Sequence, residues 1–162
     1  MSTPIDRGPI LQQPDSVYAQ ARDEALKFKW TESEKAKRDL GEFALGLWAC
    51  KYWRPFLRWR WLEHLEGKRF CAEFNADQFG LLQRPITSDH MMLGQIVDML
   101  KMGWENLEIL LWAVDSKIPC ATVHEILTKL RVNDTHLPSP FEDLAKRISE
   151  QLHHSLELSD RL

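Results

Sequence analysis

The sequence has few cysteines, and they do not form the spacing of a disulfide framework or a metal site. Its three cysteines, Cys50, Cys71 and Cys120, are far apart, and no C-x-x-C pair occurs among the 162 residues. A zinc ribbon and a thioredoxin-like redox site are therefore not indicated. Small buried thiols in a reducing compartment are the simplest interpretation.

Long apolar runs are also missing. Residues 1–14 carry three prolines and a glycine but no apolar core, which excludes a secretory signal and predicts a flexible amino-terminal arm. The longest nearly apolar run, residues 43–50, is far shorter than the roughly 20 residues that cross a bilayer. We therefore predict a cytoplasmic protein without a membrane span.

The common catalytic motifs are absent as well. The sequence has no glycine-rich phosphate loop and no G-x-S-x-G motif. Glu150, His153 and His154 can share one helix face, but a di-metal bundle needs a second Glu-x-x-His and further carboxylates. Cys50 or Cys71 would need a positioned histidine to act as a nucleophile. We predict no catalytic residue, metal or cofactor, and an enzyme of unrecognised class is only our third hypothesis.

What remains is the composition of an ordinary globular domain. Hydrophobic residues make up 44% of the chain and charged residues 28%, with a formal net charge of −3. The length fits one domain, which we place at residues 15–162. Helical periodicity predicts an all-α fold, or nearly so, of about six helices. One short strand or hairpin near 69–74 (RFCAEF) is the exception that the sequence indicates.

Capping signals and one proline set the predicted boundaries in the first half of the domain. Asp15 or Ser16 caps the first helix, and a capping box at Thr31 and Glu34 begins the second. Pro55 ends or kinks that helix, because proline lacks the amide donor. These signals predict helices over about 16–30, 31–53 and 55–67.

One predicted helix has apolar residues over most of its circumference. Residues 43–53 have almost no polar face, so we expect them to form the spine of the core. Residues 105–114 form a later helix, with Leu107, Leu110 and Leu111 predicted to point inward. Before it, Ser88 or Asp89 begins a helix that ends at Gly103. After it, a capping box at residues 139–142 begins the terminal helix.

Tryptophan and arginine are concentrated in residues 48–70. This segment holds four of the seven tryptophans and a local net charge of +4, from six basic and two acidic residues. Such a mixture forms a core with an arginine rim, a protein interface, or a surface that stacks single-stranded bases. Trp59 is the tryptophan predicted to be exposed, because it lies off the stripe of Leu57, Trp61 and Leu65. The predicted partner-binding residues are Arg54, Arg58, Trp59 and Arg60, with Met91 and Met92 as a second patch.

Residues 107–131 resemble the spacing of a helix-turn-helix unit. Ala113, Ile118 and Val123 stand where such a unit packs its two helices, although Lys117 occupies the turn position where glycine is usual. Residues 101–131 carry four basic and four acidic groups, whereas nucleic-acid binding depends on clustered cations. A nucleic-acid-binding regulator is therefore an alternative that we do not favour. Its candidate contacts are Lys51, Thr122, His124, Thr128 and Lys129.

The leading prediction is a non-enzymatic helical protein that acts as an adaptor or assembly subunit. It is expected to bind a protein partner through the surface rich in Arg and Trp, or to associate with itself. The sequence does not identify the partner.

Overall fold

The computed structural model describes residues 15–161, and the arm predicted over 1–14 lies outside the described residues. Within this range the chain is all-α, as predicted. It contains six α-helices, α1 (Val17–Ala36), α2 (Glu42–Leu65), α3 (His90–Lys101), α4 (Asn106–Asp115), α5 (Cys120–Leu130) and α6 (Glu142–Ser159), and three short 3-10 helices, η1 (Ala76–Gln78), η2 (Leu81–Gln83) and η3 (Val132–Asp134).

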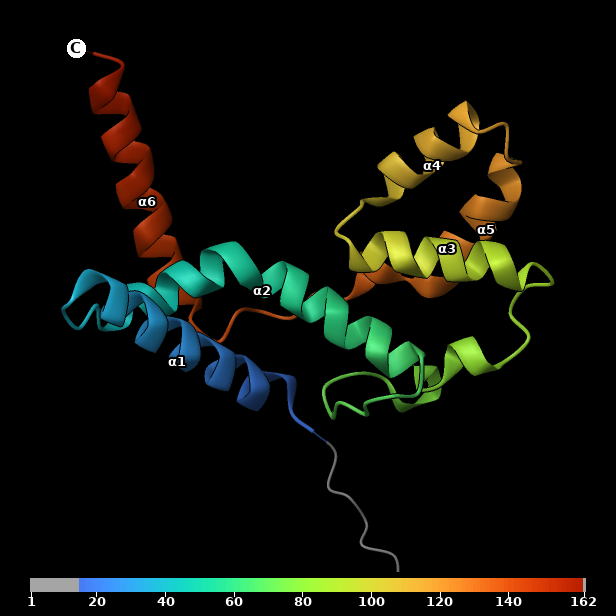
Figure 1. The fold of residues 1–162 in the computed structure, drawn as a ribbon, viewed down its shortest axis with the longest axis horizontal. Helices are drawn as coiled ribbons and strands as arrows, with labels where there is room; N and C mark the ends of the chain where they lie inside the picture. Colours follow the sequence, from blue (N-terminus) through green and yellow to red (C-terminus); the bar gives the residue numbers. More distant parts are fainter. Residues whose placement is uncertain (1–14, 162) are drawn as a thin grey trace, which may run out of the picture.

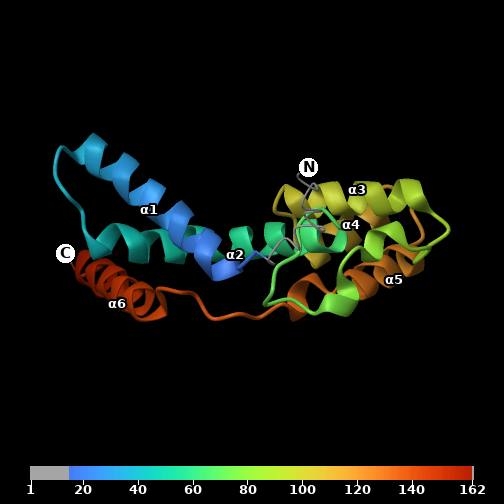
Figure 2. The same ribbon diagram turned by 90° about the horizontal axis from the view of Figure 1, so that it is seen from below.

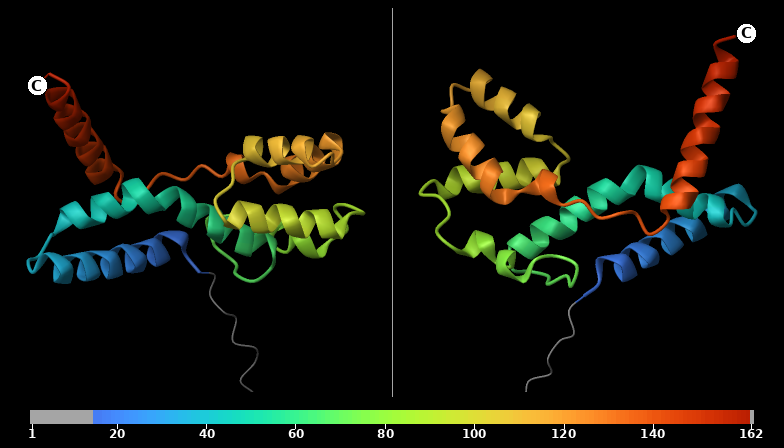
Figure 3. Two further views of the ribbon diagram at one scale, coloured as in Figure 1. Left: turned by 45° about the horizontal axis from the view of Figure 1, so that its top comes forward. Right: turned by 180° about the vertical axis from the view of Figure 1, so that it is seen from behind.

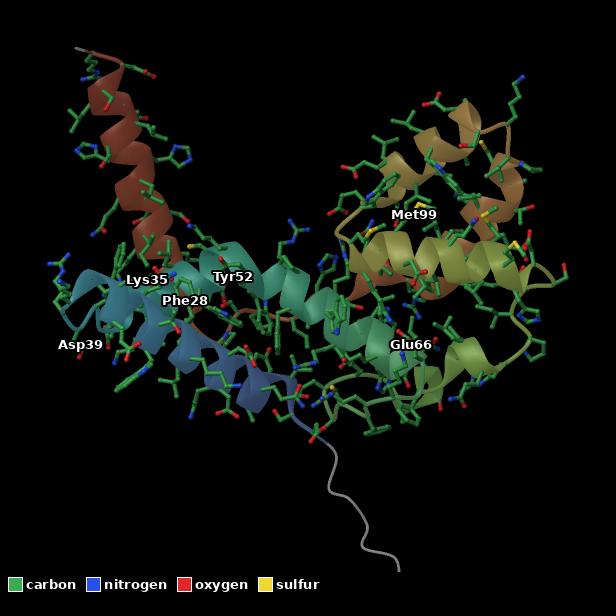
Figure 4. All side chains as sticks on the ribbon, in the orientation of Figure 1. Phe28, Lys35, Asp39, Tyr52, Glu66 and Met99 are labelled. Atoms are coloured by element: carbon green, nitrogen blue, oxygen red, sulfur yellow. The ribbon has the colours of Figure 1, made fainter. Side chains whose placement is uncertain are left out.

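Helix α2 is the spine of the fold (Figure 1). Helices α1 and α6 pack on opposite sides of its first half (Figure 2). Phe28 of α1 meets Tyr52 of α2 edge to face, with their ring centroids 5.6 Å apart (Figure 4). Helix α3 packs near the other end of α2, and α5 and α4 follow beyond it. The prediction that residues 43–53 lie in the spine is therefore confirmed.

Pro55 does not end α2, so the predicted division at this residue is wrong. The helix runs unbroken from Glu42 to Leu65 with Pro55 inside it. Proline at this position removes one hydrogen bond, to the carbonyl of Lys51, and Lys51 is exposed. Trp53 and Leu57 are buried on either side of the proline. Their burial outweighs a penalty of about 3 kcal/mol for interior proline.

The helix predicted to begin at Thr31 is also wrong, because α1 continues through the capping box to Ala36. Continuing the helix keeps its backbone hydrogen bonds, whereas a new cap there replaces only a few of them. The predicted start is confirmed: Ser16 is the N-cap and accepts a hydrogen bond from the Ala19 amide. Glu73 adds a cap from elsewhere in the chain, accepting the Val17 amide at 3.0 Å and the Ser16 hydroxyl.

Residues 69–74 do not form the predicted strand. The segment is irregular and makes one isolated parallel bridge, between Asp15 and Cys71. The Asp15 amide donates to the Phe70 carbonyl at 3.0 Å, and the Ala72 amide donates to the Asp15 carbonyl at 2.9 Å. The facing backbone turns into α1 immediately after Asp15, so the pairing cannot extend into a ladder.

Helix α4 turns two of its three leucines outward, against the prediction, whereas Leu110 is partly buried against the core as predicted. Ile109 and Ala113 are its buried residues, whereas Leu107 and Leu111 are exposed. The reason is its position: α4 packs mainly on α5 and lies away from α2 (Figure 1).

The preceding helix, α3, begins where the sequence predicts, since Asp89 caps it by accepting the Met92 amide at 2.9 Å. Gly103, with a φ of 95°, follows the end of α3.

Helix α6 begins at Glu142, two residues later than its capping box predicts. The Ser139 hydroxyl accepts the amide of Phe141 instead of that of Glu142. Among the described residues of α6, Ile148 alone is buried, and the second half of the helix projects from the rest of the molecule (Figure 3). In the described part of the chain, no helix combines the length and apolar character needed to cross a bilayer.

Candidate interaction surface

The tryptophans of α2 divide into a buried set and one exposed member. Trp48, Trp53 and Trp61 are buried, and Trp59 keeps 43% of its surface exposed. The Trp53 indole donates to the Leu137 carbonyl at 3.0 Å, and the Trp61 indole donates to the Leu130 carbonyl at 2.9 Å. These two rings tie α2 to the end of α5 and to the chain that follows it. Trp59 is therefore the tryptophan of this segment that is open to a partner.

Two of the predicted contact arginines have partners within the fold. The Arg58 guanidinium donates to both carboxylate oxygens of Glu105, at 2.9 and 3.0 Å, and also to the Trp104 carbonyl. Arg60 donates to Glu63 at 2.9 Å and lies 4.9 Å from the centre of the Phe56 ring. Both side chains are mostly covered, so their positive charge is already compensated.

Arg54 differs from these two arginines. Its side chain is exposed, and no carboxylate of residues 15–161 lies within 4.0 Å of its guanidinium. With Pro55, Arg58 and Trp59 it forms what we call the α2 ridge, which separates three hollows. One of about 550 Å³ lies against residues 132–139, one of about 180 Å³ lies against the end of α3, and one of about 450 Å³ lies beside Tyr52.

Trp59 is held in place on this ridge although it is partly exposed. Its indole nitrogen donates to Glu63 at 3.1 Å. The ammonium group of Lys101 lies 5.5 Å from the ring centre. Lys101 in turn pairs with Glu66, which lies at the end of α2 (Figure 4). The ring is thus an anchored apolar surface rather than a freely rotating side chain.

The structure does not bring the predicted methionine patch to the α2 ridge. Met91 is 79% exposed and Met92 is partly buried against the core, both in the first turn of α3. The ridge meets α3 at its opposite end, at Leu100 and Lys101. Met91 and Lys101 are ten positions apart along the helix, or about 15 Å. The two predicted patches are therefore separate surfaces.

Helices α4 and α5 are joined by a short turn with the spacing that the sequence analysis described. Lys117 adopts a φ of 57°, the left-handed conformation that glycine usually takes at such a position. Ala113 and Val123 are fully buried between the helices, and the Ile118 amide donates to the Ala113 carbonyl at 2.8 Å. This packing explains the sequence pattern as a structural requirement of the helix pair.

Of the predicted nucleic-acid contacts on α5, Thr128 and Lys129 are engaged in local interactions, whereas the His124 side chain is exposed. The ammonium group of Lys129 donates to Glu125 at 2.8 Å and also to the Ile86 carbonyl. The Lys129 hydrogen bond holds the pKa of the Glu125 carboxyl below its usual range. Thr128 donates to the His124 carbonyl, whereas Thr122 is half-buried. Lys51 is exposed, but it lies on α2 and not on this surface.

Sequence reasoning missed a histidine site at the end of α2. His64 is completely buried beside Trp61 and among the rings of Phe70, Phe74 and Phe79. Its Nε2 lies 2.9 Å from the Asn75 carbonyl, and its Nδ1 accepts the Cys71 amide at 3.5 Å. Since a carbonyl only accepts, the proton is on Nε2 and the ring is neutral. Burial lowers the pKa of His64, consistent with this state.

The signal for this site is spread over residues 64–79, where phenylalanines follow the histidine at irregular spacing. Periodicity does not detect such a cluster, because its phenylalanines lie in loops and turns outside the α-helices. The neighbouring thiol is inert: burial, reinforced by the Glu73 carboxylate, raises the pKa of Cys71 to about 11. Cys50, which is exposed, lies with its Sγ 3.3 Å from the Ala145 carbonyl.

The polar side chains do not form a metal centre in the described part of the chain. No group of three or more His, Cys, Asp or Glu side chains among residues 15–161 is placed to hold a metal ion. Glu150, His153 and His154 are exposed on the projecting half of α6.

No protein-family model matches the chain, and no curated protein or solved structure is detectably similar to it.

Proposed function

We propose that this protein is a non-enzymatic interaction module that binds a protein partner through the α2 ridge. One observation carries the proposal: Trp59 is an exposed indole, anchored by Glu63, in a ridge with hollows on both sides. Tryptophan and arginine are the residues that most often dominate the free energy of protein binding. Adjacent hollows provide places for a partner's side chains to pack against the ring.

The ridge is favourable for binding because its side chains lose little freedom on association. Arg58 is fixed by Glu105, and Trp59 is fixed by Glu63 and Lys101. A preorganised surface loses less side-chain entropy when a partner binds. Arg54, which has no carboxylate partner among residues 15–161, supplies a positive charge for a carboxylate of the partner.

The experiment is affinity capture from the native cell with the tagged full-length chain, followed by mass spectrometry. The ridge variant is Trp59→Ala with Arg54→Ala. The matched control is Trp30→Ala, because Trp30 is a 71% exposed indole on α1, outside the ridge. We expect proteins that the wild type and the control capture and the ridge variant loses. Titration of a purified partner should show a loss of about 2 kcal/mol or more.

A capture profile that is identical for the ridge variant and the wild type would contradict the proposal. Binding to random oligonucleotides would replace it with the nucleic-acid alternative, provided that Arg54→Ala with Lys51→Ala abolishes that binding. Such binding must also weaken steeply between about 50 and 200 mM salt.

A further inference from the structure

The outer face of α4 carries a row of exposed apolar side chains that the α2 ridge does not use. Leu107, Leu111 and Val114 are 66%, 56% and 59% exposed. With about 100° of rotation per residue, the three lie within an arc of about 60°. Helix α4 packs mainly on α5 and lies at the outer edge of the molecule (Figures 1 and 3). The row therefore faces away from the core.

A negatively charged edge runs along the same face. Glu108 and Asp115 are the charged residues of α4, both are exposed, and their spacing of seven places them on one flank of the apolar row. Neither has a Lys or Arg nitrogen within 4.0 Å among the described residues. Asp115 also lies in the last turn of the helix, where the helix dipole disfavours a negative charge. A cation placed at this edge would therefore be stabilised.

We infer that this face of α4 is a docking site for a basic amphipathic helix of a partner protein. Leucine side chains of the partner would cover Leu107, Leu111 and Val114, and its Lys or Arg residues would pair with Glu108 and Asp115. This is the usual way in which an amphipathic helix binds an apolar groove or face. The inference is independent of the α2 ridge, since the two surfaces share no residue.

The charge distribution favours such a partner over a second copy of the chain. Helix α4 carries no Lys or Arg, so the α4 of a second copy offers no cation to these carboxylates in either orientation. Packed antiparallel about a two-fold axis, the two helices would also place four carboxylates along one edge, because each copy contributes its Glu108 and Asp115 to the same side. Like charges that approach each other disfavour the pairing. A basic helix meets no such repulsion.

The test uses two fluorescently labelled synthetic peptides of about 14 residues, long enough for about four helical turns. One has leucines at helical spacing with lysines between them, and the other has glutamates in place of the lysines. Anisotropy titrations with the full-length chain should show that the Lys peptide binds at least about tenfold more tightly than the Glu peptide. Leu111→Asp should weaken binding of the Lys peptide at least about tenfold.

Charge reversal gives the sharpest result. Glu108→Lys with Asp115→Lys should invert the preference, so that the Glu peptide binds more tightly. The matched control is Glu150→Lys with Glu157→Lys on α6, which has the same spacing of seven and the same exposure. This control should keep the preference of the wild type. Because the substituted side chains are exposed, thermal melts should show all variants folded.

Several outcomes would overturn the inference. One is the absence of saturable binding of the Lys peptide, and another is equal affinity for the two peptides. A third is an α6 control that loses binding as strongly as the α4 variant. Sedimentation that shows self-association of the wild type, abolished by Leu111→Asp, would mean that a second copy covers this face.

Discussion

Helices α2 and α4 have similar apolar content and opposite surroundings. Helix α2 buries ten of its residues, because α1, α6, α3 and η3 pack around it. Helix α4 buries two, Ile109 and Ala113, because it packs mainly on α5. The difference shows that the sequence determines how much apolar surface a helix carries. The number of neighbouring helices determines how much of that surface is buried.

The same contrast applies to charge. The arginines of α2 at positions 58 and 60 are compensated by Glu105 and Glu63 within the fold. The carboxylates of α4 at positions 108 and 115 have no such partner among residues 15–161. The mostly covered arginines of the central helix are therefore paired within the fold, whereas the exposed carboxylates of the edge helix face solvent or a partner.

The largest expected effect is the loss of a ring that joins α2 to α5. Trp61→Ala should destabilise the protein by roughly 3–5 kcal/mol, because it leaves a cavity and removes the hydrogen bond to the Leu130 carbonyl. Denaturant unfolding measures this free energy. Trp59→Ala is the control, and a control as destabilising as Trp61→Ala would show that the α2 ridge is simply core.

A smaller effect is expected at Gly46 of α2, against which α6 packs. A Cβ at Gly46 would overlap Ile148 Cδ1 and lie 3.0 Å from Leu144 Cβ. Gly46→Ala should therefore cost about 1–3 kcal/mol of stability by overpacking. Gly94→Ala in α3 is the matched control, since no atom lies within 4 Å of its added Cβ, and it should stabilise by up to about 1 kcal/mol. A neutral Gly46→Ala variant would mean that α6 is loosely attached.

The buried histidine of α2 predicts a dependence of stability on pH. The pKa of His64 is lowered below its ordinary value of 6.5 in the folded state, so the unfolded chain takes up the proton first. The contribution of His64 to the free energy of unfolding is fully present above pH 6.5. It is lost as the pH falls below that value, by up to about 1.4 kcal/mol per pH unit. Thermal melts from pH 7.5 to 5.5 should show a steeper loss for the wild type than for His64→Gln. His154→Gln, an exposed control, should retain the full slope of the wild type.

The smallest effect is predicted on the outer face of α4. Leu111→Ser should change the free energy of unfolding by no more than about 0.5 kcal/mol, because the side chain is mostly in solvent already. Denaturant unfolding at low protein concentration measures it. A loss of 2 kcal/mol or more would show that α4 is covered in solution and would remove the contrast between the two helices.

Local signals in the sequence located the helix ends that depend on a single capping or helix-terminating residue. Ser16 and Asp89 cap α1 and α3 as predicted, and Gly103 follows the end of α3. Capping depends on a side chain a few residues from the helix end, so it can be recognised without the rest of the fold. The exposure of Trp59 was predicted for a similar reason, from its angular position on a single helix.

Other features required contacts between distant residues. The histidine cluster depends on loop residues up to Phe79, and the second cap of α1 comes from Glu73. The predicted contact residues Arg58 and Arg60 could be named from sequence, but their carboxylate partners could not, because Glu105 is 47 positions from Arg58. The binding role of these residues stays a prediction.

The sequence by itself determined the all-α class, the caps of α1 and α3, and the packing of Ala113 and Val123 between α4 and α5, because each depends on hydrogen bonds or periodicity within a few turns. Only the tertiary structure decided that α2 continues through Pro55 and that α4 turns Leu107 and Leu111 outward. Both outcomes depend on how many neighbours a helix has. Burial by several helices outweighs the lost hydrogen bond at Pro55, and a single main neighbour leaves one face of α4 bare.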